Sequence, residues 1–187
     1  MVMARKYLPL ALQSQRLVPR FRVAAIASVV LLSALLPLSG QPSECYGTWT
    51  LNLEKSLYNP GPPPYKRARM KVESLGRGRV RFSYDFVYPR GGVQHVEWDG
   101  RFDGNDYAVH GADEYVTYAY RQTGALTYEI TAKLDTRVTA VAAVTISPDG
   151  RTLTTITRGG NVRGREMRNT TVYEKVAGGR GQGAGKR

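Results

Sequence analysis

Hydrophobic and polar residues alternate along most of the chain between residues 45 and 176, which is the pattern of β-strands with one buried face. The clearest case is residues 80–88, where aromatic and aliphatic side chains occupy every second position. The same period of two recurs in residues 67–72, 126–134 and 138–146. Turn-forming residues stand where the alternation stops, at residues 76–79, 89–92, 103–105, 123–124, 148–150 and 159–161. The pattern predicts a meander of about nine or ten strands.

Short antiparallel strands joined by tight turns pack most economically as a sandwich or a closed barrel, and closure removes exposed strand edges. Because each connection is short enough for a local hairpin, we expect an all-β, up-and-down antiparallel barrel of about 8–10 strands. An outer-membrane barrel fits less well, since the polar faces are rich in Arg and Lys, which are costly against lipid.

One segment interrupts this pattern, because residues 55–64 contain four prolines and a glycine. Proline cannot donate to a strand ladder, so the segment is expected to run extended outside the sheet. It could serve as a lid over one end of the barrel. A rigid connector between the first two strands is the interpretation we favour.

The first 40 residues have the composition of an export signal. Five cations and no acidic residue precede an apolar run at residues 23–36, and small residues follow Pro37. The run is shorter than the roughly 20 residues that span a bilayer, so we expect a signal peptide cleaved near Gly40 and a periplasmic or secreted mature protein. The alternative is an uncleaved signal anchor that holds the protein in the membrane through residues 23–38.

The charge changes with this division of the chain. The leader contributes five of the charges in the formal net +12, and three more lie in a Gly-rich tail, residues 178–187, which leaves about +4 on residues 41–177. We expect the tail to be disordered and residues 41–177 to form the barrel. Most of the excess positive charge therefore lies outside the domain, which argues against a nucleic-acid-binding face. Cys45 is the only cysteine, so no intramolecular disulfide is possible, although its thiol could pair between chains.

Three segments of the chain form a recognisable set: residues 47–64 (GTWTLNLEKSLYNPGPPP), 102–111 (FDGNDYAVHG) and 172–175 (VYEK). They resemble a family of small exported bacterial proteins that has no established activity. Members of that family are similar to lipocalin-like, or calycin-like, barrels. The resemblance implies that Trp49 closes the base of the barrel beside an arginine from a late strand, which could be Arg158 or Arg168. Trp49 could equally be an ordinary large core aromatic.

The faces expected to point into the barrel carry aromatic side chains that have one polar atom each, while several alanines leave space. A barrel of this size can hold one small ligand among such groups. A core filled by its own side chains is the alternative. The residues predicted to line a ligand site are Tyr84, Tyr88, Trp98, Tyr118 and Tyr128.

A second candidate surface is a basic hairpin, formed by Arg67, Arg69, Lys71, Arg79 and Arg81. It could bind an anionic surface of the cell envelope, although charged strand faces are also common where no partner exists. Nucleic acid fits less well, because binders interleave aromatics with basic residues on one face and here the aromatics point the other way.

Motifs for catalysis or metal binding are absent from the sequence. His95, Glu97 and Asp99 alternate along one strand, but alternate residues lie about 6–7 Å apart, which is awkward for one coordination sphere. We therefore expect no enzyme, no metal and no cofactor. Two functions remain open: an exported barrel that binds a small amphipathic or apolar molecule, and a ligand-free interaction module of the envelope that uses the basic hairpin and tail. Membrane contact is expected only if the leader is retained.

Overall fold

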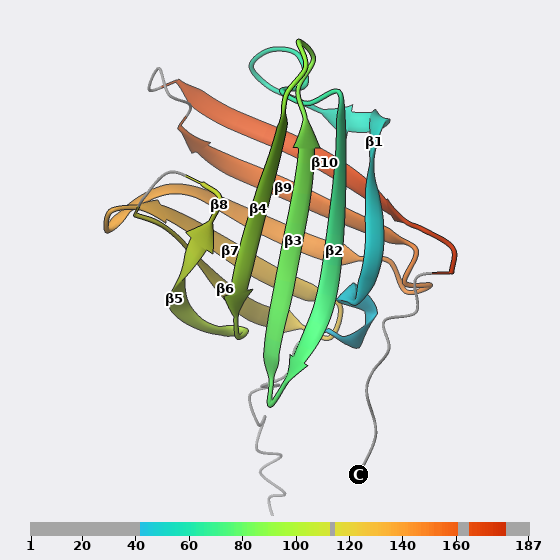
Figure 1. Cartoon of the computed structure of the whole chain (residues 1–187), viewed down its shortest axis with the longest axis vertical. Coiled ribbons are helices and arrows are strands. Elements are labelled where there is room, and N and C mark those ends of the chain that lie inside the picture. Colours follow the sequence, from blue (N-terminus) through green and yellow to red (C-terminus); the bar gives the residue numbers. More distant parts are fainter. Residues whose placement is uncertain (1–41, 113–114, 161–164, 179–187) are drawn as a thin grey trace, which may run out of the picture. The chain divides into compact units, whose positions relative to one another are not determined.

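The computed structural model describes residues 42–112, 115–160 and 165–178, which form a closed antiparallel barrel of ten strands (Figure 1). Each strand pairs with the next along the chain, and the last strand pairs with the first. This confirms the predicted all-β, up-and-down barrel. The strands are β1 (Gly47–Leu57), β2 (Arg67–Gly76), β3 (Arg79–Val87), β4 (Val93–Gly100), β5 (Asp103–His110), β6 (Val116–Gly124), β7 (Thr127–Leu134), β8 (Arg137–Ile146), β9 (Thr152–Gly160) and β10 (Glu166–Lys175).

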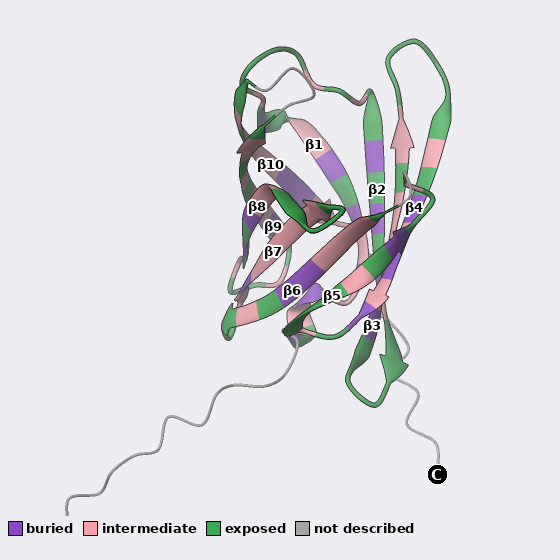
Figure 2. Ribbon diagram, turned by 90° about the vertical axis from the view of Figure 1, so that its left-hand side faces the viewer, coloured by how far each residue is buried: buried purple, intermediate pink, exposed green. Residues whose placement is uncertain are grey.

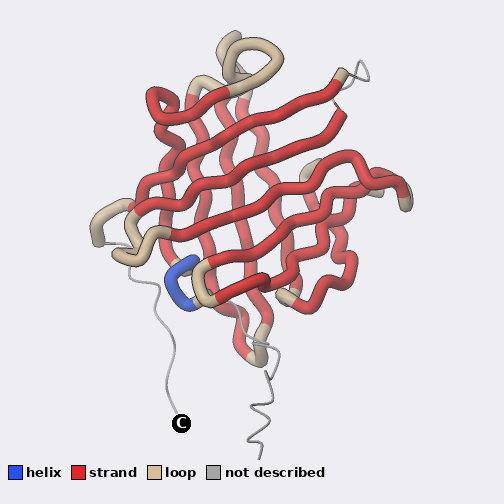
Figure 3. The backbone as a smooth tube through the Cα atoms, turned by 180° about the vertical axis from the view of Figure 1, so that it is seen from behind, coloured by secondary structure: helices blue, strands red, loops and turns tan. Residues whose placement is uncertain are grey.

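The only helix in this part of the chain is a single 3₁₀ turn, η1 (Ser43–Cys45), which precedes β1 (Figure 3). None of the described residues forms a helix that is long and apolar enough to cross a bilayer. The predicted signal segment, residues 1–40, and all but the first residue of the predicted tail, residues 178–187, lie outside the described residues.

The predicted turns at residues 76–79, 89–92 and 148–150 fall at connections between consecutive strands. Residues 123–124 and 159–160 are instead the last residues of β6 and β9, and the turn predicted at residues 103–105 is wrong. These residues begin β5, and the β4–β5 connection lies just before them. The register of β5 against β6 shifts between Asp103 and Asp106, and Gly104 has a φ of 79°. The Asp103 carboxylate accepts a hydrogen bond from the Asn105 N–H at 3.0 Å. A bulge inside a strand therefore uses the same residues as a turn.

One end of the barrel is filled by aromatic side chains and is called here the closed end. Trp98 stacks on Tyr120 with ring centroids 4.0 Å apart, and Phe82 lies 4.9 Å from Tyr120. These three side chains and Trp49 are fully buried. The indole Nε1 of Trp49 donates a hydrogen bond to the Cys45 carbonyl oxygen at 2.8 Å, which fixes η1 across this end. Figure 2 shows buried residues alternating with exposed ones along the strands, as the period of two requires.

Closure between β1 and β10 includes an irregularity that a side chain repairs. The register shifts between Asn52 and Leu57, so the regular ladder is interrupted there. Ser56 fills the interruption: its Oγ accepts a hydrogen bond from the Val172 N–H at 3.0 Å and donates one to the Asn52 carbonyl oxygen at 2.6 Å. Ser56 is 8% exposed, so water cannot easily replace these bonds.

Replacing Ser56 with Ala should therefore lower the free energy of unfolding by about 1–3 kcal/mol, because a buried N–H and a carbonyl oxygen lose their partner. Urea unfolding followed by circular dichroism measures the change. Thr50→Ala, at an exposed position of the same strand, is the control and should change stability by less than about 0.5 kcal/mol. Equal effects of the two substitutions would contradict the role assigned to Ser56.

Candidate ligand-binding site

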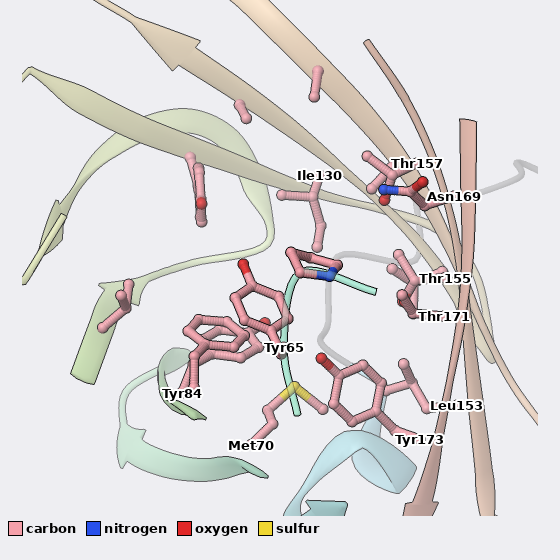
Figure 4. Close-up of a pocket in the computed structure, with 18 of the residues that line it drawn as sticks. Tyr65, Met70, Tyr84, Ile130, Leu153, Thr155, Thr157, Asn169, Thr171 and Tyr173 are labelled. Atoms are coloured by element: carbon pink, nitrogen blue, oxygen red, sulfur yellow. The ribbon is translucent and has the colours of Figure 1, made fainter. Parts of the chain in front are cut away.

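The other end of the barrel contains a cavity of about 460 Å³ (Figure 4). This volume lies within the range of about 300–1,000 Å³ found for pockets that hold drug-sized molecules. The exposed residue Pro64 is part of the lining, so the cavity reaches the surface beside the connector, residues 58–66. Its lining comprises Tyr58, Pro64, Tyr65, Met70, Tyr84, Phe86, Gln94, Val96, Ala112, Tyr118, Tyr120, Tyr128, Ile130, Ala132, Ala140, Ala142, Val144, Leu153, Thr155, Thr157, Met167, Asn169, Thr171 and Tyr173.

One wall of the cavity is aromatic and includes a residue from the connector. Tyr65 stacks on Phe86 with ring centroids 4.3 Å apart, and Phe86 stacks on Tyr84 at 5.7 Å. The connector is tied to the barrel at both ends. Lys66 N–H donates to the Val87 carbonyl oxygen at 2.7 Å, and the Asn59 carbonyl oxygen accepts from the Arg168 N–H at 2.8 Å.

These bonds support a fixed connector, which also contributes Tyr58, Pro64 and Tyr65 to the cavity. The prediction that residues 55–57 belong to this segment is wrong, since they are the last residues of β1.

The opposite wall is polar and comes from β9 and β10. Thr155 and Thr157 on β9 face the cavity beside Asn169 and Thr171 on β10 (Figure 4). Because successive side chains of a strand point to opposite faces, the positions between them point outward. We call these four residues the polar wall.

The phenols around the cavity are uncharged at neutral pH. Burial raises the pKa of Tyr84, Tyr120 and Tyr128 above the ordinary value for tyrosine, and it raises the pKa of Tyr65 to about 12. The hydroxyls of Tyr84 and Tyr120 lie 3.3 Å apart and form a hydrogen bond. The hydroxyl of Tyr58 is buried and has no hydrogen-bond partner among the described residues.

Of the five predicted lining residues, the structure brings Tyr84, Tyr118 and Tyr128 together in the cavity. It places the other two elsewhere, which corrects the prediction. Tyr88 is 36% exposed and donates a hydrogen bond from its hydroxyl to the Gln94 side chain. Trp98 belongs to the packed closed end, where its Nε1 donates to the Tyr118 carbonyl oxygen at 3.0 Å.

Sequence reasoning missed the polar wall and the two connector tyrosines. The signal for the polar wall was present, because Thr155 and Thr157 alternate with the apolar Ile156 in the same phase as the buried Leu153. Nothing in a proline-rich segment fixes the direction of its side chains, so Tyr58 and Tyr65 carried no comparable signal.

Trp49 lies at the closed end as the resemblance implied, but its cationic neighbour is a lysine. Lys175 Nζ lies 4.8 Å from the centroid of the Trp49 ring and donates to the Glu44 carbonyl oxygen at 2.8 Å. Arg158 and Arg168 are exposed. They lie opposite each other in the β9–β10 ladder, toward the other end of β10. The expectation of an arginine beside Trp49 is therefore corrected to Lys175. The inward direction of Lys175 could have been predicted, because alternation puts it on the same face of β10 as Tyr173.

The thiol of Cys45 is fully buried under the same end of the barrel. Burial raises its pKa to about 12, so it is a protonated, shielded thiol in the folded chain. Pairing between chains would require η1 to move away from the barrel.

The basic hairpin has an exposed face, as predicted, and acidic side chains share it. Arg67, Arg69 and Lys71 alternate with buried residues on β2. Lys71 contacts Glu73 at 2.8 Å, and Arg81 forms a two-bond ion pair with Asp99 at 2.7 Å. The charges on this surface are therefore mixed, and binding to an anionic envelope surface stays a prediction.

The acidic and histidine residues of β4 are also partnered on the outer face. His95 Nδ1 lies 2.7 Å from the Asp85 carboxylate, which is the main cause of the raised pKa of His95. His95 Nε2 lies 3.4 Å from Glu97, whereas Asp99 is bound to Arg81. Among the described residues, no group of three potential ligands is arranged for a metal ion.

Comparison with solved structures finds barrels at low sequence identity. The wild-type fluorescent protein UnaG aligns with 71% of this chain and 98% of its own, at 10% identity and a TM-score of 0.48. The zebrafish ileal bile acid-binding protein, in complex with cholic acid, covers 71% of this chain and 99% of its own at 12% identity and a TM-score of 0.42. The siderocalin Ex-FABP covers 71% and 74% at 13% identity and a TM-score of 0.38.

No family model matches the chain. No curated protein matches it either. The resemblance to small exported bacterial proteins therefore stays a prediction.

The buried phenols predict how stability changes in alkali. In the unfolded chain these tyrosines ionise near pH 10, whereas their raised pKa keeps them protonated in the barrel. The free energy of unfolding is thus fully retained below about pH 10. It should fall above that pH by about 1.4 kcal/mol per pH unit for each phenol that stays protonated in the native state.

Tyr128→Phe should make the free energy of unfolding fall less steeply with pH, by the contribution of one phenol, about 1.4 kcal/mol per pH unit. Urea unfolding between pH 9 and pH 11.5 measures this slope. The two proteins should show parallel stabilities below pH 9, which is the internal control. Identical slopes above pH 10 would mean that the Tyr128 phenol ionises in the folded barrel.

Proposed function

We propose that the protein is an exported, non-enzymatic barrel that binds a small amphipathic or apolar molecule in its cavity. The observation that carries this proposal is the contrast between the two ends of one barrel. The closed end is packed with aromatic side chains, whereas the other end holds about 460 Å³ lined by apolar surface and a few hydrogen-bonding groups.

The cavity is kept open by small residues at positions where larger ones would fill it. Ala132, Ala140 and Ala142 line it from β7 and β8. These three positions therefore leave space that larger side chains on the inner faces of β7 and β8 would occupy.

The non-enzymatic part of the proposal is supported by the kind of residues that line the cavity. Among the described lining residues there is no Asp, Glu, His, Cys or Lys. These are the side chains that most often supply a nucleophile or a general base. The acidic and histidine groups of β4 are on the outer face, where they pair with each other and with Arg81.

Filling the cavity should abolish binding without unfolding the barrel. Nile red, a neutral apolar dye with one carbonyl acceptor, serves as the probe, and its fluorescence is titrated with the purified mature protein. Ala142→Phe places a ring in the cavity and should weaken binding at least about tenfold, because the dye and the ring compete for the same volume.

Ala143→Phe is the matched control, since the next residue of the same strand is exposed on the outer face. It should leave the affinity unchanged. Equal affinities of wild type and Ala142→Phe would show that the dye binds elsewhere. Absence of dye binding by the wild type, together with a bare polypeptide mass in native mass spectrometry, would overturn the carrier function.

The export part of the proposal rests on the composition of residues 1–40. Protein purified from the envelope fraction of its own cells should begin near Gln41, as measured by intact mass and N-terminal sequencing. A chain that keeps residues 23–38 and stays with the membrane fraction would establish the signal anchor instead.

A further inference from the structure

The described residues that line the cavity include no side chain that is charged at neutral pH. This feature separates two classes of amphipathic ligand: those with an ionised carboxylate, sulfate or phosphate, and those whose polar groups are neutral oxygens. Building on the proposed function, we propose that the cavity selects uncharged amphipathic molecules that carry hydroxyl or carbonyl oxygens, and that the polar wall binds these oxygens.

The cations nearest to the cavity in the sequence are turned away from it. Arg158 directly follows the cavity residue Thr157, and Arg168 directly precedes the cavity residue Asn169. Both arginines are exposed, because alternation along β9 and β10 puts them on the outer face. Lys175 does face inward, but it lies over Trp49 at the closed end.

An anionic ligand would therefore meet no counter-charge among the described residues of the lining. Burying an ionised carboxylate without a cation or several hydrogen-bond donors is strongly unfavourable. The surrounding phenols would not compensate by titration, because burial raises the pKa of Tyr84 and Tyr65 and keeps both groups neutral. The electrostatics of the site therefore favour a neutral molecule.

The polar groups that the cavity does offer suit neutral oxygens. Asn169 Oδ1 already accepts a hydrogen bond from the Asn59 N–H at 3.1 Å, which leaves its Nδ2 group free to donate on the side of the cavity (Figure 4). Thr155, Thr157 and Thr171 add hydroxyls that can either donate or accept.

The position of these groups also implies an orientation. Tyr65, Phe86 and Tyr84 stack in a row, which we call the aromatic wall. Tyr65 and Tyr84 of this wall lie across the cavity from the polar wall (Figure 4). A bound molecule would place its oxygens toward β9 and β10 and its apolar body against the rings.

The test compares two competitors that share a chain length and differ in charge. Dodecan-1-ol and dodecanoate each displace bound Nile red from the full mature protein at pH 8, where dodecanoate is ionised. Dodecan-1-ol should bind at least about tenfold more tightly. Lowering the pH to 5 should strengthen displacement by dodecanoate, because a larger share of it becomes the neutral acid, and should leave dodecan-1-ol unchanged.

Thr157→Val tests the assignment to the polar wall. It should weaken dodecan-1-ol by about three- to tenfold, since one hydrogen bond to the ligand is lost. Thr154→Val is the matched control, because alternation along β9 puts its side chain on the outer face.

The outcomes are distinguishable. Equal displacement by dodecanoate and dodecan-1-ol at pH 8 would overturn the inference about charge while Nile red binding still supports the carrier function. An unchanged affinity in Thr157→Val would overturn the assignment of the ligand's oxygens to the polar wall. Failure of the wild type to bind Nile red would overturn the proposed function itself.

Discussion

Pairing of β1 with β10 is the interaction on which the rest of the barrel depends. All other neighbouring strands are consecutive in the chain, whereas this ladder joins residues more than one hundred positions apart, such as Trp49 and Lys175. Closing so long a loop costs conformational entropy, and this cost precedes any stabilisation by the β1–β10 ladder. The ladder also places Lys175 over Trp49 and carries Ser56 at its irregular point, so the seal of the closed end and the closure of the sheet are one structure.

The same closure allows the barrel to tolerate the free-energy cost of an unfilled cavity. A packed core at the closed end supplies the buried apolar area that stabilises the barrel, with Phe82, Trp98 and Tyr120 in mutual contact. The other end can then hold small residues and unfilled volume, because long ladders such as β2–β3, β7–β8, β8–β9 and β9–β10 continue around it. Stability and the proposed binding thus depend on different lengths of the same strands.

Alternation along the strands predicts much of this division, and the predictions that were wrong have local causes. The period of two predicted the strands and three of the five predicted lining residues, Tyr84, Tyr118 and Tyr128. Tyr88 lies beyond the end of β3, where alternation no longer fixes direction. The polar wall was not predicted because the hydropathy pattern is inverted on β9. Ile156 is 37% exposed, whereas Thr155 and Thr157 face inward. A rule that assigns apolar residues to the interior cannot predict a polar inner face that would contact a ligand instead of the core.

The inverted face is what gives the cavity a direction. In a purely apolar cavity a ligand gains similar free energy in several orientations, because burial of apolar area is non-directional. A row of hydroxyl and amide groups on β9 and β10 breaks that equivalence, since each unmatched polar group costs about 1–3 kcal/mol when buried. In the proposed binding, the aromatic wall would contribute mainly affinity, and the polar wall would contribute mainly selection among molecules of similar size. Because no described cation of β9 or β10 lines the cavity, that selection would be made by hydrogen bonding.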